Sequence, residues 1–202
     1  MYLYYLVRLL AFVLTKFFFH LKIKGREYIP RKGGFVLVSN HASFLDPVIL
    51  SAACPRVINF AARDTLFRNR FFAALISRLC AFPIKRWSAD LAAVKESVRR
   101  LKANAGLLVF PEGTRNASAD IDMQNMTYGF VLLAHRAGVP IIPVWISGSN
   151  KAWGKSDKMM KLAKIKVIFG QAVYTEHRHP YVETARDVYK RMQQLKIKSV
   201  HF

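Results

Sequence analysis

Apolar and polar positions along the chain follow a strand pattern in some segments and a helical period in others. Their order predicts strands that alternate with helices. Apolar runs typical of strands lie at 34–39, 57–62, 82–84, 107–110, 140–146 and 164–170. Segments with a helical period begin at about 47, 69, 88, 129 and 181. Such an alternation predicts an α/β fold: a mixed, largely parallel sheet flanked by helices on both sides.

A further helix is predicted at the amino terminus, over residues 2–20. The segment is apolar except for a narrow polar stripe made of Arg8, Thr15, Lys16 and His20. A helix of this length spans roughly 28 Å, enough to cross a bilayer core, but two cations inside the segment would be costly there. We therefore expect an amphipathic anchor that lies in the membrane interface. A buried core helix is the alternative.

The composition of the chain indicates which kinds of partner the protein could bind. The 202 residues include 32 Lys plus Arg against 12 Asp plus Glu, a formal net charge of +20, and 52% of the chain is hydrophobic. A folded, apolar and basic protein suits either nucleic acid or an anionic membrane surface. The apolar amino terminus favours the membrane, so no nucleic acid is expected. We expect an anchor over 1–24 and one domain over 25–202.

The cysteines and the remaining histidines do not indicate a metal site. Cys54 and Cys80 both lie in apolar helical patterns without a histidine or cysteine at ligand spacing. Buried free thiols are therefore expected, which fits a reducing compartment. His177 and His179 lack a third ligand, so we interpret them as surface residues.

A histidine and an aspartate follow the strand predicted at 34–39, in the segment SNHASFLDP. Five positions along one helix would place His41 and Asp46 on nearly opposite faces, so the two side chains can pair only across a turn. Asp46 also precedes Pro47, a combination typical of a helix N-cap and first helical position. A helix cap and a catalytic pair are the two interpretations at this point.

A second polar turn, FPEGTR at 110–115, follows the strand predicted at 107–110. Gly113 lets the backbone approach a ligand, Glu112 offers an acceptor, and Arg115 offers a planar, charged fork suited to phosphate. A third stretch, AFPIKRW at 81–87, ends a short strand in Lys85 and Arg86. Ligand sites of open α/β sheets collect at the carboxyl ends of strands, where these turns are expected.

The order of these motifs, followed by VPIIPVWISG at 139–148, resembles the 1-acylglycerol-3-phosphate (lysophosphatidic acid) acyltransferase family in its small bacterial type. The resemblance covers roughly 25–170. It implies that His41 and Asp46 are the catalytic pair. By the same resemblance, the substrate-binding residues are Arg86, Glu112, Gly113, Thr114 and Arg115.

The resemblance also implies the reaction and its setting. A fatty acyl group would pass from an acyl carrier protein or coenzyme A thioester to the hydroxyl of 1-acylglycerol-3-phosphate, which gives phosphatidic acid. No cofactor and no metal are expected. The expected location is the cytoplasmic face of the bacterial inner membrane, with the protein peripheral or monotopic.

The chemistry of the residues agrees with this interpretation. Histidine, with an ordinary pKa of about 6.5, suits a general base near neutral pH, and Asp46 would hold its tautomer. The acceptor hydroxyl is the nucleophile, so we expect Ser43 to be a turn hydrogen-bonder; backbone N–H groups around Gly113 are candidate oxyanion donors. The loop at 116–129 departs from the family pattern. Another lysolipid or glycerol 3-phosphate as acceptor, and a non-catalytic protein that binds anionic lipid, are the alternatives.

Overall fold

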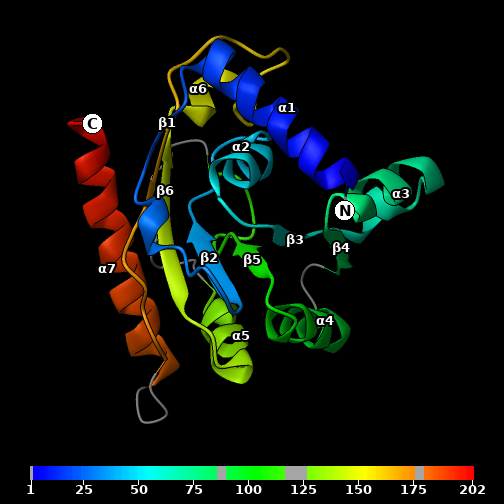
Figure 1. Ribbon diagram of the computed structural model, residues 1–202, viewed down its shortest axis with the longest axis vertical. Helices are drawn as coiled ribbons and strands as arrows, with labels where there is room; N and C mark the ends of the chain where they lie inside the picture. Colours follow the sequence, from blue (N-terminus) through cyan, green and yellow to red (C-terminus); the bar gives the residue numbers. More distant parts are fainter. Residues whose placement is uncertain (1, 86–89, 117–126, 176–179) are drawn as a thin grey trace.

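The computed structural model describes residues 2–85, 90–116, 127–175 and 180–202, which form a seven-stranded sheet with helices on both faces (Figure 1). The strands are β1 Lys22–Lys24, β2 Phe35–Ser39, β3 Ile58–Arg63, β4 Ala81–Ile84, β5 Gly106–Val109, β6 Ile141–Ser147 and β7 Lys166–Phe169. The helices are α1 Tyr2–Phe19, α2 Asp46–Ala53, α3 Arg70–Arg78, α4 Leu91–Lys102, α5 Gly129–Ala137, α6 Ser149–Trp153 and α7 Tyr181–Val200. Short 3-10 turns lie at Arg26–Tyr28 and Asp64–Phe67.

The strand order is β1-β7-β6-β2-β5-β3-β4. The five strands from β6 to β4 run parallel, whereas β7 is antiparallel to β6 and β1 is parallel to β7. The predicted α/β fold with a mixed, largely parallel sheet is confirmed. The strand β1 and the short helix α6 were not predicted from the sequence. β1 lies inside the segment expected to be the anchor, yet it pairs with the sheet; the division at residue 24 stays a prediction.

Side chains of the central strand β2 enter two cores, one on each face of the sheet. Val36 and Val38 pack on the side covered by α4, α5 and α7, and Phe35 and Leu37 pack on the side covered by α2. All five residues of β2 are buried. A strand covered on both faces needs a continuous apolar run rather than an alternating one, which is why FVLVS has that composition.

Helix α1 lies along the outer side of α2 (Figure 1) and exposes most of its apolar surface. Its buried residues are Tyr4, Thr15 and Phe19. By contrast Leu6, Leu10 and Phe17 are 64%, 56% and 74% exposed. The alternative of a buried core helix is therefore wrong.

Both ends of α1 are attached to the domain. The Tyr4 hydroxyl accepts a hydrogen bond from the backbone N–H of Ile58 at 3.1 Å. At the other end, the carbonyl of Phe19 accepts one from the N–H of Ile165 at 2.9 Å. Arg8, from the predicted polar stripe, turns toward the domain and donates to the carbonyl of Cys54. By length and hydropathy α1 could cross a membrane, but Arg8 and Thr15 are directed into the protein, whereas Lys16 stays exposed.

Candidate active site

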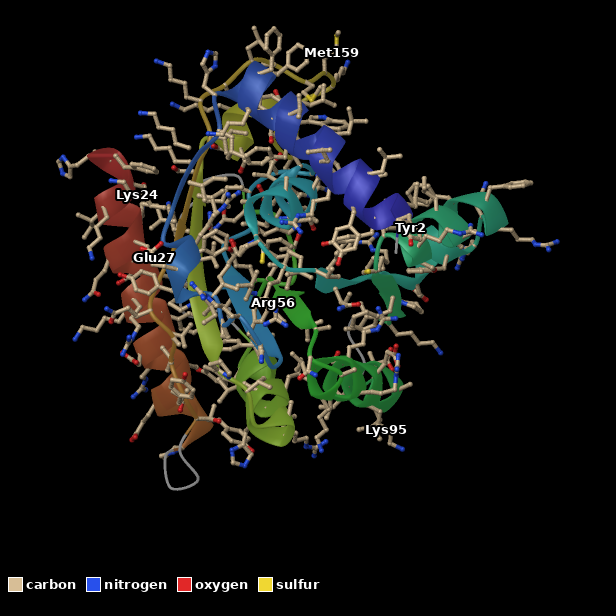
Figure 2. The ribbon with its side chains drawn as sticks, viewed as in Figure 1. Tyr2, Lys24, Glu27, Arg56, Lys95 and Met159 are labelled. Carbon is tan, nitrogen blue, oxygen red and sulfur yellow. The ribbon has the colours of Figure 1, made fainter. Side chains whose placement is uncertain are left out.

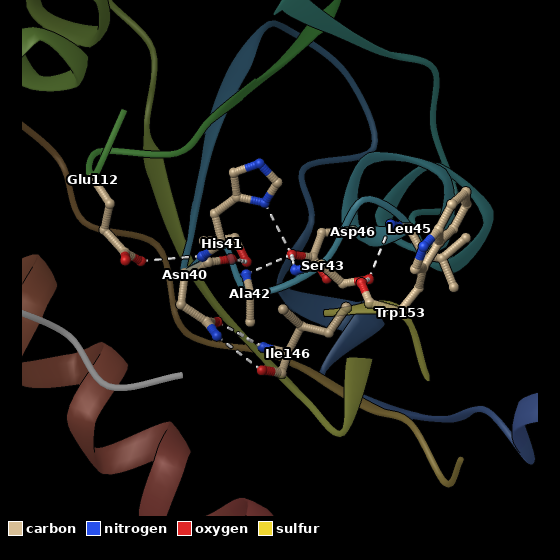
Figure 3. A network of polar contacts seen from close by, with 10 residues as sticks. Asn40, His41, Ala42, Ser43, Leu45, Asp46, Glu112, Ile146 and Trp153 are labelled. Atoms are coloured by element: carbon tan, nitrogen blue, oxygen red, sulfur yellow. Dashed lines mark hydrogen bonds and ion pairs between the residues drawn. The ribbon is translucent and has the colours of Figure 1, made fainter. Parts of the chain in front are cut away.

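The two polar turns selected from the sequence meet because they follow neighbouring parallel strands. β2 pairs with β5 in a register that sets Val38 opposite Val109, so both strands end at the same edge of the sheet. The backbone N–H of His41 donates to Oε1 of Glu112 at 3.0 Å (Figure 3). In return the N–H of Asn116 donates to the carbonyl of His41 at 2.8 Å.

The side chains of His41 and Asp46 meet across the turn, which is the only way the sequence spacing allows them to pair. His41 Nδ1 lies 2.9 Å from Asp46 Oδ2, and the other ring nitrogen points away from the carboxylate (Figure 3). The Asp46 side chain is completely buried, whereas that of His41 keeps 14% of its surface exposed. The imidazole stacks on Phe110 with ring centroids 4.1 Å apart. The ring is thus held on one side and accessible in part.

The interpretation of Asp46 as a helix cap is wrong. Asp46 is the first residue of α2, and the helix has no side-chain cap at its start. Oδ2 instead accepts the backbone N–H groups of Ala42 and Ser43, each at 2.7 Å, together with the His41 ring. Backbone donors of the preceding turn, rather than those of the helix, therefore hold this oxygen. Oδ1 is buried without a hydrogen-bond partner among the described residues.

Ser43 is a turn hydrogen-bonder, as predicted. Its Oγ donates to the carbonyl of Trp153 at 2.7 Å and accepts the N–H of Leu45 at 3.1 Å. The residue is fully buried. A hydroxyl that is both engaged and enclosed is not placed to carry an acyl group.

Asn40 is a positioning residue that the sequence analysis did not select. Its Nδ2 donates to the carbonyl of Ile146, and its Oδ1 accepts the N–H of the same residue, both at 2.9 Å (Figure 3). The end of β2 is thereby fastened to β6 on one side, while Glu112 fastens it to the β5 side. The signal available in the sequence was an amide residue directly before His41, at the end of a predicted strand.

Arg115 adds a cation beside the His41 turn. Its guanidinium lies over the ring of Phe44, 3.4 Å from the centroid. Burial and the nearby Arg63 lower the pKa of Arg115, and Asp46 acts in the opposite direction. Nη1 is buried and has no hydrogen-bond partner in the described part of the chain. The site therefore contains a charged donor that no described residue of the protein uses.

Three predicted site residues remain, which are Gly113, Thr114 and Arg86. Gly113 has a φ of +64°, with no atom near the position of a Cβ, and its N–H donates to the carbonyl of Phe110. That N–H is engaged within the turn, so the expected oxyanion donor is not Gly113 itself. Thr114 is exposed in the same turn. Arg86 lies outside the described residues.

A parallel sheet that brings a histidine–aspartate turn and a basic turn to one edge defines a site suited to acyl transfer. Residues 20–147 match the family model described as Acyltransferase, more than half of the chain. The chain belongs to the Acyltransferase family, and the family predicted from the motifs is confirmed.

The individual relatives are distant in sequence, and one solved structure shares the fold. The chain is 27% identical over 154 residues to a 1-acyl-sn-glycerol-3-phosphate acyltransferase of Bacillus subtilis. The matched region covers 76% of this chain and 73% of the relative. Relatives of the same name from Borreliella burgdorferi and Streptococcus pneumoniae are 28% and 34% identical, and the chain covers 62% and 42% of their lengths. The crystal structure of the 1-acyl-sn-glycerophosphate (LPA) acyltransferase PlsC from Thermotoga maritima matches with a TM-score of 0.78 at 21% identity. That match covers 96% of this chain and 79% of the other.

We expect Asn40→Ala to lower the free energy of unfolding by about 2 kcal/mol, because both polar groups of Ile146 lose their buried partner. Acyl transfer should also slow by about tenfold or more, since His41 follows directly and small displacements of a reacting group are costly. Urea unfolding followed by circular dichroism and turnover in the same detergent check the two effects.

Asn59→Ala is the matched control. Asn59 is also buried in a strand, where its amide donates to the carbonyl of Gly106 at 3.1 Å. That variant should lose stability but keep its turnover. Equal losses of turnover in the two variants would contradict a positioning role for Asn40.

Proposed function

We propose that the chain is a membrane-bound 1-acylglycerol-3-phosphate O-acyltransferase. It transfers a fatty acyl group from an acyl carrier protein or coenzyme A thioester to the free hydroxyl of the lysolipid, and the product is phosphatidic acid. The observation that carries the proposal is the 2.9 Å contact between His41 Nδ1 and Asp46 Oδ2 beside Arg115, whose buried Nη1 has no hydrogen-bond partner among the described residues. The names of the curated relatives support this acceptor.

His41 is the general base in this mechanism. Nε2 accepts the proton of the acceptor hydroxyl while the hydroxyl oxygen attacks the thioester carbonyl. Asp46 accepts the hydrogen bond of Nδ1–H, which keeps Nε2 unprotonated before the reaction and stabilises the imidazolium afterwards. The new C–O bond forms, the C–S bond breaks, and the proton passes from His41 to the thiolate that leaves. The N–H groups of Thr114 and Arg115, after the engaged N–H of Gly113, are the candidate donors to the oxyanion.

Arg115 binds the phosphate of the acceptor. A guanidinium is permanently charged and presents donors in one plane, which matches two phosphate oxygens. Its stacking on Phe44 holds that plane, and the buried Nη1 gains a partner when phosphate is bound. Glu112 supports the site through the backbone of His41, and Thr114 contributes an exposed hydroxyl. Arg86 is proposed as a second cation for the phosphate.

The outward face of α1 is the membrane anchor in this proposal. A helix attached at both ends along a folded domain, with Arg8 turned inward, suits a monotopic position in the interface rather than a crossing of the bilayer. The net charge of +20 suits an anionic membrane surface. Cys54 and Cys80 are free thiols, which fits the cytoplasmic face of a bacterial inner membrane.

The acyltransferase proposal is tested by mass spectrometry of the products that the purified protein forms from a panel of lysolipids and glycerol 3-phosphate with both thioesters. Phosphatidic acid should be the main product. His41→Ala should lower turnover by about 10²-fold or more, because the base is removed. His135→Ala, on α5 beside Tyr181, is the matched control and should keep its rate. A folded His41→Ala protein with a near-normal rate would remove the proposed mechanism.

Arg115→Lys keeps the charge but loses the planar fork, so we expect KM for the lysolipid to rise by about tenfold. KM for the thioester should stay unchanged. Steady-state kinetics with each substrate varied in turn separate the two effects, and Arg136→Lys on the exposed face of α5 serves as the control. Equal effects on both substrates would show that Arg115 does not bind the phosphate.

The anchor is tested by substitution rather than deletion, because removal of α1 would uncover α2. The change Leu6→Asn, Leu10→Asn and Phe17→Asn makes the exposed face polar without altering buried residues. Partition onto vesicles in high salt should fall by about 10²-fold or more, because salt screens only the electrostatic part of binding. Vesicle sedimentation measures this loss. If the variant stayed bound to neutral vesicles in high salt, the anchor would have to lie elsewhere.

A further inference from the structure

The segment at 155–164, between α6 and β7, combines large exposed apolar side chains with lysines. Met159, Met160 and Leu162 are 75%, 57% and 76% exposed. The same ten residues contain four lysines and a single acidic residue, Asp157. Neighbouring apolar groups of this size at a protein surface commonly mark a contact with a partner.

The segment is a folded turn rather than a loose connection. Asp157 Oδ2 accepts the N–H of Gly154 at 2.9 Å, and Oδ1 pairs with Lys161 Nζ at 2.8 Å. The N–H of Lys161 donates to the carbonyl of Ala152 at 2.8 Å, and Trp153 Nε1 donates to the carbonyl of Asp157 at 3.3 Å. These bonds fold the segment back onto α6, and its apolar side chains stay at the surface.

This turn continues the exposed apolar face of α1. Ile165, which follows the segment, donates its N–H to the carbonyl of Phe19 at the end of α1, 2.9 Å away. Figure 2 shows Met159 near that end of the helix, whereas Tyr2 lies at the other end. Phe17, in the last turn of α1, is 74% exposed. An apolar surface therefore extends along α1 and onto the segment.

The same turn borders the candidate active site through Trp153. The Trp153 carbonyl accepts the hydrogen bond of the Ser43 hydroxyl at 2.7 Å (Figure 3). The Trp153 ring lies 5.2 Å from that of Phe44, centroid to centroid. Phe44 in turn carries the guanidinium of Arg115. One residue, Gly154, separates Trp153 from the segment.

We propose that residues 155–164 are a second membrane-contact segment, with Met159, Met160 and Leu162 in the interface of an anionic bilayer and Lys155, Lys158 and Lys164 on its lipid phosphates. The inference rests on the proposed membrane-bound function and adds the side from which a lipid acceptor reaches Arg115. An acidic protein surface would also pair with the lysines. The apolar continuity with α1 favours lipid, because one flat apolar phase covers both elements at once.

The test places an environment-sensitive nitrobenzoxadiazole label at Met159→Cys. A reference label is placed at Phe17→Cys, and a control label at Lys95→Cys on α4, which lies far from Met159 in Figure 2. The parent variant is Cys80→Ser. Burial raises the pKa of the Cys54 thiol to about 11, so Cys54 stays protonated and unlabelled at neutral pH.

Vesicles of phosphatidylcholine and phosphatidylglycerol should shift the emission at 159 and at 17 to the blue, and spin-labelled lipid should quench both. The label at 95 should show neither effect. If 17 responds while 159 behaves like 95, the segment stays in water and the inference is overturned, although α1 still binds the membrane. If neither responds, the membrane-bound function fails as well.

A second variant, Met159→Asn with Met160→Asn and Leu162→Asn, links the contact to the reaction. Its partition onto anionic vesicles should fall by about tenfold or more, and so should its rate on long-chain lysolipid in vesicles. Its rate on a short-chain acceptor dispersed in water should stay unchanged. Leu91→Asn, 67% exposed on α4, is the matched control and should change none of these. A vesicle rate equal to that of the control would overturn the inference.

Discussion

One carboxylate oxygen, Oδ2 of Asp46, determines the geometry of the whole site. It accepts the N–H groups of Ala42 and Ser43 and the Nδ1 of His41, all within 2.9 Å. The first two bonds define the turn and the third orients the imidazole, so the shape of the turn and the direction of the ring cannot vary independently. A group that is completely buried also has no access to water as a substitute partner, which makes each of these bonds costly to lose.

The sheet supplies the second constraint, because β2 lies between β5 and β6. Glu112 from the β5 turn holds the N–H of His41, and the backbone of Ile146 on β6 holds Asn40. The two residues that follow β2, Asn40 and His41, are therefore tied to different neighbouring strands or turns. A central strand buried on both faces is the least mobile part of such a sheet, and His41 follows Asn40 directly beyond the end of that strand.

The fold class was predictable because the central strands are continuous apolar runs and the helices have one apolar face. β1 was not, because KIK contains one apolar residue and becomes a strand only through its pairing with β7. Asp46 directly before Pro47 matches the local sequence pattern of a helix cap. Its carboxylate instead accepts the backbone N–H groups of Ala42 and Ser43. Only the folded turn shows which of these donors the carboxylate binds. The contacts of Asn40 with Ile146 and of Arg115 with Phe44 join residues 106 and 71 positions apart. No local pattern contains them.

The position of α1 relates the candidate active site to the proposed membrane surface. The helix directs Tyr4 and Arg8 into the domain and leaves a face outside that is apolar apart from Lys16, which is the reverse of an ordinary surface helix. Water is a poor solvent for that face, whereas a membrane interface suits it. The turn after Trp153 ends beside the last residue of α1, and Trp153 itself contacts Ser43 and Phe44, over which the guanidinium of Arg115 lies. In the proposed membrane-bound position, a lipid acceptor with its phosphate at the bilayer surface would need to move only from the headgroup layer to the adjoining turn, so the proposed membrane-binding surface would also set the direction from which the acceptor approaches.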